Sequence, residues 1–211
     1  MKGERAFKTI LRRVPVDYYQ TGNVLQRLWH GRKWWVVKSF LSQNDKKILD
    51  VGCAGGYSTN QISQAVLGAK LTGIDIYGDS IRFARICYPG ARFLVADAEN
   101  LPFRGKSFDV VVSTEVIEHL SNPEKMIEEV WRVLKSGGKF ILEVDTESLL
   151  FRSIWWFWTR WGPGKVWQGS HLTQFSVSDL ERLLMKNGFR IKDRKIFNLG
   201  MAVAFSAIKK G

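Results

Sequence analysis

A cluster of glycines behind a short apolar run is the part of the sequence with the clearest capacity for chemistry. Residues 48–51 are long enough for one buried strand, and Gly52, Gly55 and Gly56 follow them directly. Apolar residues at helical spacing then continue through residues 57–66. In an open α/β sheet, this order of strand, tight turn and helix is where a nucleotide-like ligand meets backbone N–H groups at a helix N-terminus.

The residues around the turn limit which ligand it can take. A phosphate-binding P-loop needs a Lys and a Ser or Thr after its last glycine, whereas Tyr57 follows Gly56. A dinucleotide turn prefers Gly-x-Gly-x-x-Gly, and this turn reads Gly-x-x-Gly-Gly. Asp50 at the strand end would repel a pyrophosphate and attract an ammonium or sulfonium group. The turn therefore favours a nucleoside-like ligand with a positive end, although a plain βα turn fits the same residues.

Acidic residues recur where further strands are predicted to end. Residues 70–75 predict a second strand that ends in Asp75, about 20 residues after the first glycine, the offset at which an acid accepts hydrogen bonds from ribose hydroxyls. A third strand over residues 91–96 ends before Asp97, which either accepts from an adenine amino group or is an exposed loop acid. Ligands bind at this carboxyl edge of parallel sheets.

The remaining elements complete an α/β pattern. Residues 108–113 predict a central parallel strand, since Val110, Val111 and Val112 form an apolar run. Residues 139–144 predict a fifth strand. Residues 189–197 and 202–209 are joined by a short loop, so they are expected to pair as an antiparallel hairpin.

Two helices are predicted before the first strand. Residues 1–14 form a basic amphipathic helix that either docks on the domain or lies on an anionic membrane. A second helix over residues 23–41 is expected to face inward with these residues: Leu25, Leu28, Trp29, Trp35 and Val36. Arg32 lies beside that face, where its guanidinium either pairs with a ligand carboxylate or is solvated.

A strongly aromatic stretch, residues 146–170, follows the fifth predicted strand. Five of the nine tryptophans lie between Trp155 and Trp167, and Arg152 and Arg160 stand close by. Because it follows the carboxyl end of a strand, we expect this stretch to overhang the ligand crevice. Three interpretations compete: a lid lining an apolar substrate pocket, a surface for a membrane interface or a partner, or the core side of an extra helix.

Charge is unevenly distributed within the net charge of +12. Residues 1–40 hold nine Lys/Arg against two Asp/Glu, and residues 186–211 hold seven against one, while residues 41–185 are nearly neutral. Basic ends favour nucleic acid, an anionic membrane surface or an acidic substrate. A basic surface that only aids solubility fits equally well.

Cysteine usage and hydropathy bound the environment of the protein. Cys53 and Cys87 cannot build a disulfide framework, and neither lies in a Cys/His cluster with metal-ligand spacing, so we predict no metal site. No apolar core of a signal peptide is visible in residues 1–14, and no segment reaches the ~20 apolar residues of a membrane span. We expect a cytoplasmic protein, with peripheral contact to a membrane left open.

Six motifs stand in a fixed order along the chain. They are Ile48-Leu49-Asp50-Val51-Gly52-Cys53-Ala54-Gly55-Gly56, Gly73-Ile74-Asp75-Ile76, Asp97-Ala98-Glu99-Asn100-Leu101-Pro102-Phe103, Phe108-Asp109-Val110-Val111-Val112, Glu115-Val116-Ile117-Glu118-His119-Leu120 and Arg132-Val133-Leu134-Lys135-Ser136-Gly137-Gly138. As a set they resemble class I S-adenosylmethionine-dependent methyltransferases, in particular the ubiquinone and menaquinone biosynthesis (methyltransferase type 11) group. The resemblance is strong over residues 45–145 and loose over residues 171–190.

The resemblance implies a fold, a cofactor and a domain plan. The fold is an α/β, Rossmann-like three-layer sandwich with a mostly parallel seven-stranded sheet and a C-terminal antiparallel β-hairpin. The cofactor is S-adenosyl-L-methionine, which leaves as S-adenosyl-L-homocysteine. We expect a single methyltransferase domain, 1–211, divided into an N-terminal helical cap (1–44), a cofactor-binding core (45–145), an aromatic lid insertion (146–170) and a C-terminal helix and hairpin (171–211).

The same resemblance implies cofactor-binding residues at the turn and the strand ends: Asp50, Gly52, Cys53, Ala54, Gly56, Asp75, Ile76, Asp97, Ala98, Thr114 and Glu115. The turn meets the methionine part of the cofactor, the second strand end holds the ribose, and the third strand end holds the adenine. The family usually has glycine where Ala54 stands, and we expect binding to survive the added methyl group.

The sequence leaves the methyl acceptor open. The sulfonium is already activated, so the enzyme mainly aligns acceptor and methyl group and excludes water, while a hydroxyl acceptor would also need a base. His171 and His119 are the candidate catalytic residues, although each fits a pocket-lining or structural role as well. We expect a small apolar or aromatic acceptor, lipid- or quinone-like.

Two other functions compete with this one. An RNA methyltransferase would use the basic ends, and a non-catalytic cofactor-binding scaffold would explain Ala54 and the lack of an obvious base. An oligomer formed through exposed tryptophans is also compatible with the sequence.

Overall fold

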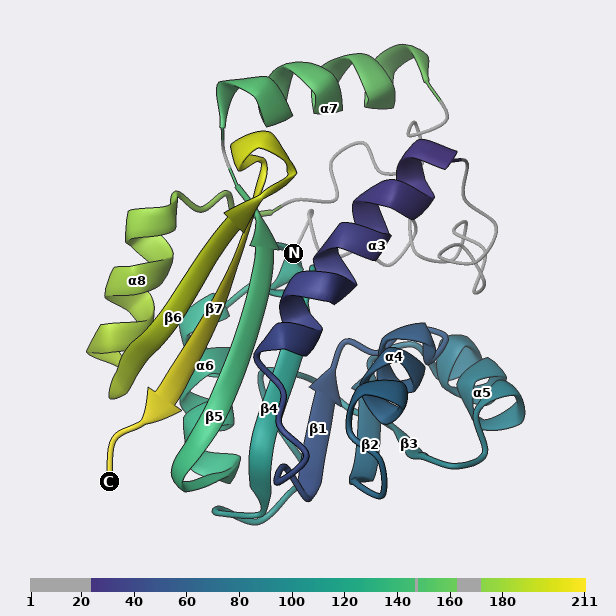
Figure 1. Ribbon diagram of the computed structural model, residues 1–211, viewed down its shortest axis with the longest axis vertical. Helices are drawn as coiled ribbons and strands as arrows, with labels where there is room; N and C mark the ends of the chain where they lie inside the picture. The colour runs from purple at the N-terminus through teal and green to yellow at the C-terminus, as the bar shows by residue number, and fades with distance from the viewer. Residues whose placement is uncertain (1–23, 147, 163–171) are drawn as a thin grey trace.

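A single seven-stranded sheet organises the computed structural model, which describes residues 24–146, 148–162 and 172–211 (Figure 1). The strand order is β3-β2-β1-β4-β5-β7-β6. The strands are β1 (Lys47–Val51), β2 (Lys70–Asp75), β3 (Arg92–Val95), β4 (Phe108–Thr114), β5 (Leu134–Asp145), β6 (Phe189–Phe197) and β7 (Ala202–Lys209). Strands β1 to β5 pair in parallel, and β7 runs antiparallel to both β5 and β6. The predicted sheet and its C-terminal hairpin are confirmed.

Helices cover both faces of this sheet. They are α3 (Val24–Ser39), α4 (Tyr57–Ala65), α5 (Gly78–Cys87), α6 (Pro123–Val133), α7 (Leu149–Trp161) and α8 (Val177–Lys186), with short 3-10 turns η1 (Ile117–His119) and η3 (Asn198–Gly200). Buried residues of α6 and α8 share one core cluster with Val111, whereas α3 and α4 share another with Val110 and Val112. Successive side chains of a strand point to opposite faces, so the middle of β4, Val110 to Val112, has to be apolar on both sides.

The inward face of α3 differs from the prediction. Leu28 and Trp35 are 65% and 69% exposed, whereas Lys33, Trp34 and Val37 are buried. Each residue turns an α-helix by about 100°, so the buried stripe is rotated away from the predicted one. Val36 is buried as predicted. On the buried side, Trp34 and Val37 pack in the cluster of Val110 and Val112, and Lys33 forms an ion pair with Glu115.

The aromatic stretch begins with a helix at the carboxyl end of β5. Ser148 caps α7 by accepting a hydrogen bond from the backbone N–H of Phe151, and α7 lies across this end of the sheet in Figure 1. The predicted helix over residues 1–14 and the later part of the aromatic stretch, from residue 163, lie outside the described residues. Among the described helices, none has the length and apolar character needed to cross a bilayer.

Candidate active site

The turn after β1 is tied to β2 and depends on glycine at two positions. The backbone N–H groups of Gly52 and Cys53 both donate to the carbonyl of Ile74, at 2.8 and 2.9 Å. Gly52 has φ +76°, and a Cβ there would lie 2.2 Å from a methyl carbon of Val116. Gly56 has φ +88° at the start of α4. Both positions therefore require glycine, which places the turn backbone close to any ligand above it.

Ala54 has a strained backbone conformation. Its φ is +44°, in the left-handed region that costs a non-glycine residue about 1–2 kcal/mol. Its backbone N–H donates to Oδ2 of Asp75 at 2.9 Å. This hydrogen bond holds the turn against the end of β2 and offsets part of the strain.

Asp50 is a buried acid with one oxygen available for a cation. Its Oδ2 accepts hydrogen bonds from the hydroxyls of Ser58 and Thr59, at 2.5 and 2.7 Å. Oδ1 is buried and has no hydrogen-bond partner among the described residues. Burial raises the pKa of Asp50 to about 6, against the lowering effect of the two hydroxyls. An ammonium group would satisfy Oδ1, so this position fits the amino group of the proposed cofactor.

Asp75 is held at the end of β2 with its oxygens fixed by backbone groups. Oδ2 accepts from Ala54 and Oδ1 from the N–H of Tyr77, at 2.9 and 3.0 Å. Burial raises the pKa of this carboxyl group, and the backbone hydrogen bonds oppose the rise. Each carboxylate oxygen retains a second acceptor site, which fits the paired hydroxyls of a ribose. The neighbouring Ile76 is exposed.

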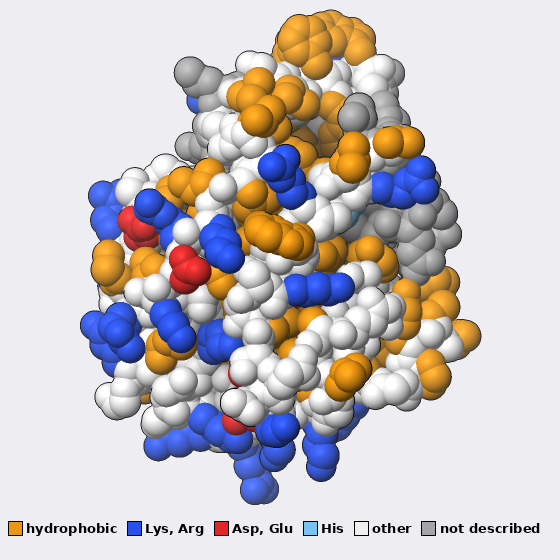
Figure 2. Space-filling view, in the orientation of Figure 1, with side chains coloured by type: hydrophobic (Ala, Val, Ile, Leu, Met, Phe, Trp, Pro, Cys, Tyr) orange, Lys and Arg blue, Asp and Glu red, His pale blue; other side chains and the backbone are white. Residues whose placement is uncertain are grey.

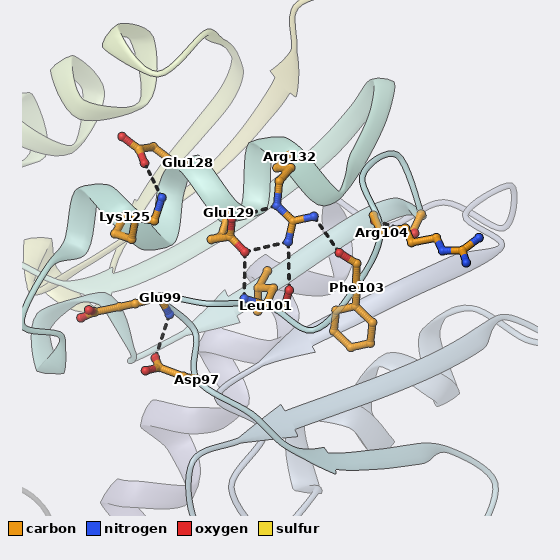
Figure 3. Close-up of polar contacts among 10 residues, drawn as sticks. Asp97, Glu99, Leu101, Phe103, Arg104, Lys125, Glu128, Glu129 and Arg132 are labelled. Atoms are coloured by element: carbon orange, nitrogen blue, oxygen red, sulfur yellow. Dashed lines mark hydrogen bonds and ion pairs between the residues drawn. The ribbon is translucent and has the colours of Figure 1, made fainter.

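The loop after β3 is braced by α6 (Figure 3). The guanidinium of Arg132 donates to the carbonyls of Leu101 and Phe103 at 2.9 and 2.6 Å. Glu129 pairs with Arg132 and also accepts from the N–H of Leu101 at 2.8 Å. Within the same loop, Asp97 accepts from the backbone of Glu99 at 2.8 Å. Arg132 thus fixes the far end of the loop that begins with Asp97.

Asp97 and Ala98 lie in the part of that loop nearest to β3. The side chain of Asp97 is exposed, and Ala98 is partly buried against the core. This exposure fits either of the two interpretations of Asp97, an adenine contact or a loop acid.

A cleft opens between α3 and the glycine turn. It is lined by Lys33, Trp34, Gly52, Cys53, Ala54, Tyr57, Ser58 and Thr114. Four of the predicted cofactor residues therefore share one cleft, and Asp50 contacts it through Ser58. Arg32 is exposed and does not line this cleft. The basic residue that α3 brings to the cleft is its neighbour, Lys33.

A cluster of acids surrounds the Lys33 ammonium. Nζ of Lys33 lies 2.7 Å from Oε2 of Glu115, and the Lys33 side chain is 2% exposed. Ligand atoms of Glu115, Glu143 and Asp145 lie within 4.8 Å of one another. Burial raises the pKa of Asp145, and repulsion from the neighbouring acids raises it further. Burial also raises the pKa of Glu143, although the Lys33 ammonium acts to lower it. The three carboxyl groups could hold a cation, and the Lys33 ammonium supplies positive charge there.

The backbone around this cluster is also strained. Glu115 has φ +53° at the end of β4, and its N–H donates to the carbonyl of Glu143 at 3.1 Å. Strained residues of this kind concentrate at functional sites. Glu118, one turn further, is buried, and burial raises its pKa to about 8. His30 lies on α3 near Lys33, and burial lowers its pKa to about 4, so it is neutral at pH 7.

The structure describes one of the two candidate catalytic histidines. His119 ends η1, is partly exposed, and donates its backbone N–H to Val116. His171 lies outside the described residues. Sequence reasoning missed Lys33, because one lysine in a basic helix carries no signal of its own. The acids that end β4 and β5 were the signal, since together they call for a cation.

The fold and the residues at its carboxyl edge define a class of ligand-binding site. A mostly parallel sheet carries a glycine turn, an acid on β2 and an acid loop after β3 at one edge, which is the arrangement of a Rossmann-like nucleoside-binding site. The free oxygen of Asp50 and the fixed carboxylate of Asp75 fit the ends of S-adenosylmethionine.

Comparison with known sequences identifies the family. Residues 49–142 match the family described as a methyltransferase domain. A methyltransferase of Synechocystis is 34% identical over 159 residues, covering 72% of this chain and 70% of that protein. The mitochondrial ubiquinone biosynthesis O-methyltransferase of Rattus norvegicus is 31% identical over 156 residues, covering 69% of this chain and 45% of the relative. The phthiotriol/phenolphthiotriol dimycocerosates methyltransferase of Mycobacterium leprae is 38% identical over 95 residues, covering 44% of this chain and 35% of the relative. The match spans less than half the length of the rat and mycobacterial relatives.

Solved structures agree on the fold. A putative methyltransferase in complex with the Haloferax volcanii Trm112 activator has a TM-score of 0.78 at 17% identity, covering 97% of this chain and 98% of that one. An S-adenosylmethionine-dependent methyltransferase of Mesorhizobium loti has a TM-score of 0.69 at 20% identity, covering 84% and 97%. The chain belongs to the S-adenosylmethionine-dependent methyltransferases of type 11, a family of enzymes whose cofactor is S-adenosylmethionine.

Proposed function

We propose that the chain transfers the methyl group of S-adenosylmethionine to an apolar or aromatic small molecule, lipid- or quinone-like. The observation that carries the proposal is the aromatic contact between α7 and α3. The ring of Phe151 lies 6.5 Å from that of Trp29 and is stacked at 5.5 Å on Trp155. Trp29 precedes the buried His30 and lies one helical turn from Lys33, which lines the cleft. An apolar acceptor would find aromatic walls beside the reacting end of the cofactor.

The names of relatives point in the same direction. The rat relative is named for ubiquinone biosynthesis, and a relative in Mycolicibacterium smegmatis is named a fatty-acid O-methyltransferase. Since this chain matches only part of each, their substrates support the proposal for this chain without fixing it.

The ion pair of Lys33 and Glu115 suits an acceptor that reacts through oxygen. An ammonium beside a hydroxyl favours its ionised form, and an ionised oxygen attacks the sulfonium methyl in line without a covalent intermediate. The pKa of Lys33 is raised by its acidic neighbours against desolvation, so the side chain stays charged. Lys33 therefore stabilises the anion, while the proton passes to a base, for which His119 and His171 remain candidates.

The test uses a cofactor labelled in its methyl group and three acceptor classes: a prenylated catechol, a long-chain fatty acid and total RNA. We expect label in a lipid-soluble product, and none with the Asp75→Ala variant, which loses the ribose contact. Label confined to RNA would replace this proposal with the RNA methyltransferase. Cofactor binding by the wild-type chain, without transfer to any class, would favour the scaffold.

The location of the protein remains a prediction. A cytoplasmic protein with peripheral membrane contact is consistent with an apolar acceptor.

A further inference from the structure

One side of α7 is apolar and exposed. Leu150, Ile154, Phe157 and Trp161 recur at spacings of four, three and four residues, which places them in one stripe of the helix. All four are exposed, with Phe157 and Trp161 at 59% and 63%, and so is Trp156 at 48%. These five residues are called the α7 apolar face. Figure 2 shows hydrophobic side chains gathered at the end of the molecule where Figure 1 places α7.

The opposite side of α7 is already packed. Phe151 and Thr159 are buried, and Phe151 contacts Trp29 of α3. The helix is therefore held on the domain by one side only. Within the α7 apolar face, the rings of Trp156 and Phe157 each lie about 5 Å from that of Trp161, so the stripe is a preformed aromatic surface.

The apolar surface continues beyond α7. Leu199 in η3 is 81% exposed, and η3 adjoins the start of α7 because Thr146 donates from its backbone N–H to Met201 and from its hydroxyl to Gly200. A contiguous apolar patch of this kind marks an interaction surface.

The charges beside this surface select its occupant. Arg160 of α7 is exposed beside the stripe and lies over the ring of Trp156 at 5.5 Å, whereas the exposed Arg152 is on the other side of the helix. Neither α7 nor α3 contains an Asp or a Glu, and α3 adds exposed Arg27 and Arg32. A second copy of the chain would bring the same arginines to the contact and repel. An occupant that is apolar inside and anionic at its surface satisfies both features.

We propose that the α7 apolar face docks into the interface of an anionic phospholipid bilayer, with Arg160 at the lipid headgroups. Tryptophan is favoured at this depth, where its ring is apolar and its N–H is wet. The 13-residue helix is about 20 Å long, too short to span a bilayer, so it lies in the membrane plane. The biological role of this docking rests on the proposed function, in which a membrane-borne acceptor would enter between α7 and α3.

The experiment measures sedimentation of the full chain with vesicles of phosphatidylcholine, with and without phosphatidylglycerol. We expect binding to the anionic vesicles, weakened roughly fivefold in Arg160→Gln, the equivalent of about 1 kcal/mol for the charge removed. Arg152→Gln should weaken it less, because Arg152 is on the other side of the helix. The double variant Phe157→Ser/Trp161→Ser should lose at least about tenfold in affinity, since two exposed rings no longer enter the interface.

A matched control separates this face from the general positive charge of the protein. Leu67 and Ile86 are as exposed as the α7 residues but belong to the α4 and α5 region. Leu67→Ser/Ile86→Ser should bind vesicles like the wild type, and cofactor binding should be unchanged in every variant. Equal loss in both double variants would overturn the proposal. So would anionic binding that is insensitive to the α7 changes, or dimers that the α7 changes abolish.

The outcome is independent of the methyl transfer assay. Vesicle binding without label transfer would reject the proposed function alone. Label transfer to a lipid-soluble acceptor without vesicle binding would reject the docking face alone.

Discussion

Replacing Lys33 by methionine tests whether its ammonium is what holds the acid cluster together. The side chain is 2% exposed and its partner Glu115 is 16% exposed, so the ion pair is buried. Removing one partner of a buried pair costs about 3–5 kcal/mol, because the other charge is left uncompensated. Methionine preserves most of the volume, so loss of packing contributes little. We expect the free energy of unfolding at pH 8 to fall by about 3 kcal/mol.

The loss should depend on pH. Burial already raises the pKa of Glu143 and Asp145, and Lys33 opposes that rise. Without Lys33 the pKa of both groups should rise further, so they keep in the folded state, over a wider pH range, a proton that they release on unfolding. The unfolded chain then binds fewer protons than the folded chain, so stability falls as pH rises. The deficit of Lys33→Met should therefore be smaller at pH 5.5 than at pH 8.

Urea unfolding followed by far-ultraviolet circular dichroism at both pH values measures the deficit. Glu115→Gln added to Lys33→Met should recover more than half of the loss at pH 8, since the stranded charge is gone. Arg32→Met, one residue away and exposed, should change stability by less than about 0.5 kcal/mol. A loss below 1 kcal/mol at pH 8, or an equal loss at both pH values, would refute the reasoning.

Three further substitutions test other parts of the site. Glu118 is buried with a pKa of about 8, so the native protein keeps a proton that the unfolded chain releases. The free energy of unfolding should therefore fall between about pH 5 and 8. In Glu118→Gln that fall should be smaller by about 2–4 kcal/mol, as measured by unfolding at both ends of the range. Ala54→Gly relieves a positive φ and should raise stability by up to about 1 kcal/mol, with a cofactor dissociation constant by calorimetry within about threefold of the wild type; a tenfold change would show that the methyl group contacts the ligand. Arg132→Lys keeps the charge but loses the paired contacts to two carbonyls, so it should cost about 1–3 kcal/mol of stability and weaken cofactor binding; unchanged unfolding would mean that the loop is held by other contacts.

The fold was predictable because local signals agreed with each other. All seven strands were expected from apolar runs, and six of them lie within two residues of the predicted bounds, whereas β5 begins five residues earlier than predicted, at Leu134. The turn was equally legible, since Gly52 and Gly56 both adopt positive φ. Because the first five strands run in parallel, the acids that follow them could be predicted to lie at one edge of the sheet. These features depend on neighbours in sequence, which a single chain displays.

The direction of α7 was not predictable in the same way. Its composition fits a lid, a surface and a core helix equally well, and the choice depends on which side meets α3. In the structure α7 has a buried side and an exposed apolar side: Phe151 packs inward, while Phe157 and Trp161 are exposed. A periodic pattern reveals one stripe of a helix, but an aromatic helix has apolar residues on every side, so tertiary contacts decide.

The rotation of α3 places both an apolar contact and an ion pair on its buried side. Trp34 and Trp35 are equivalent by hydrophobicity, and an apolar stripe through Trp35 was the simpler expectation. Burying Trp34 instead brings Lys33 into the cleft, where Glu115 accepts its ammonium. Trp34, Val37 and Phe40 pack into the apolar cluster of β1 and β4 on the same side of α3, and the acids that end β4 and β5 supply the partners of Lys33. A pattern of apolar residues does not show such partners for a lysine, so the inward face of α3 could be decided only from tertiary contacts.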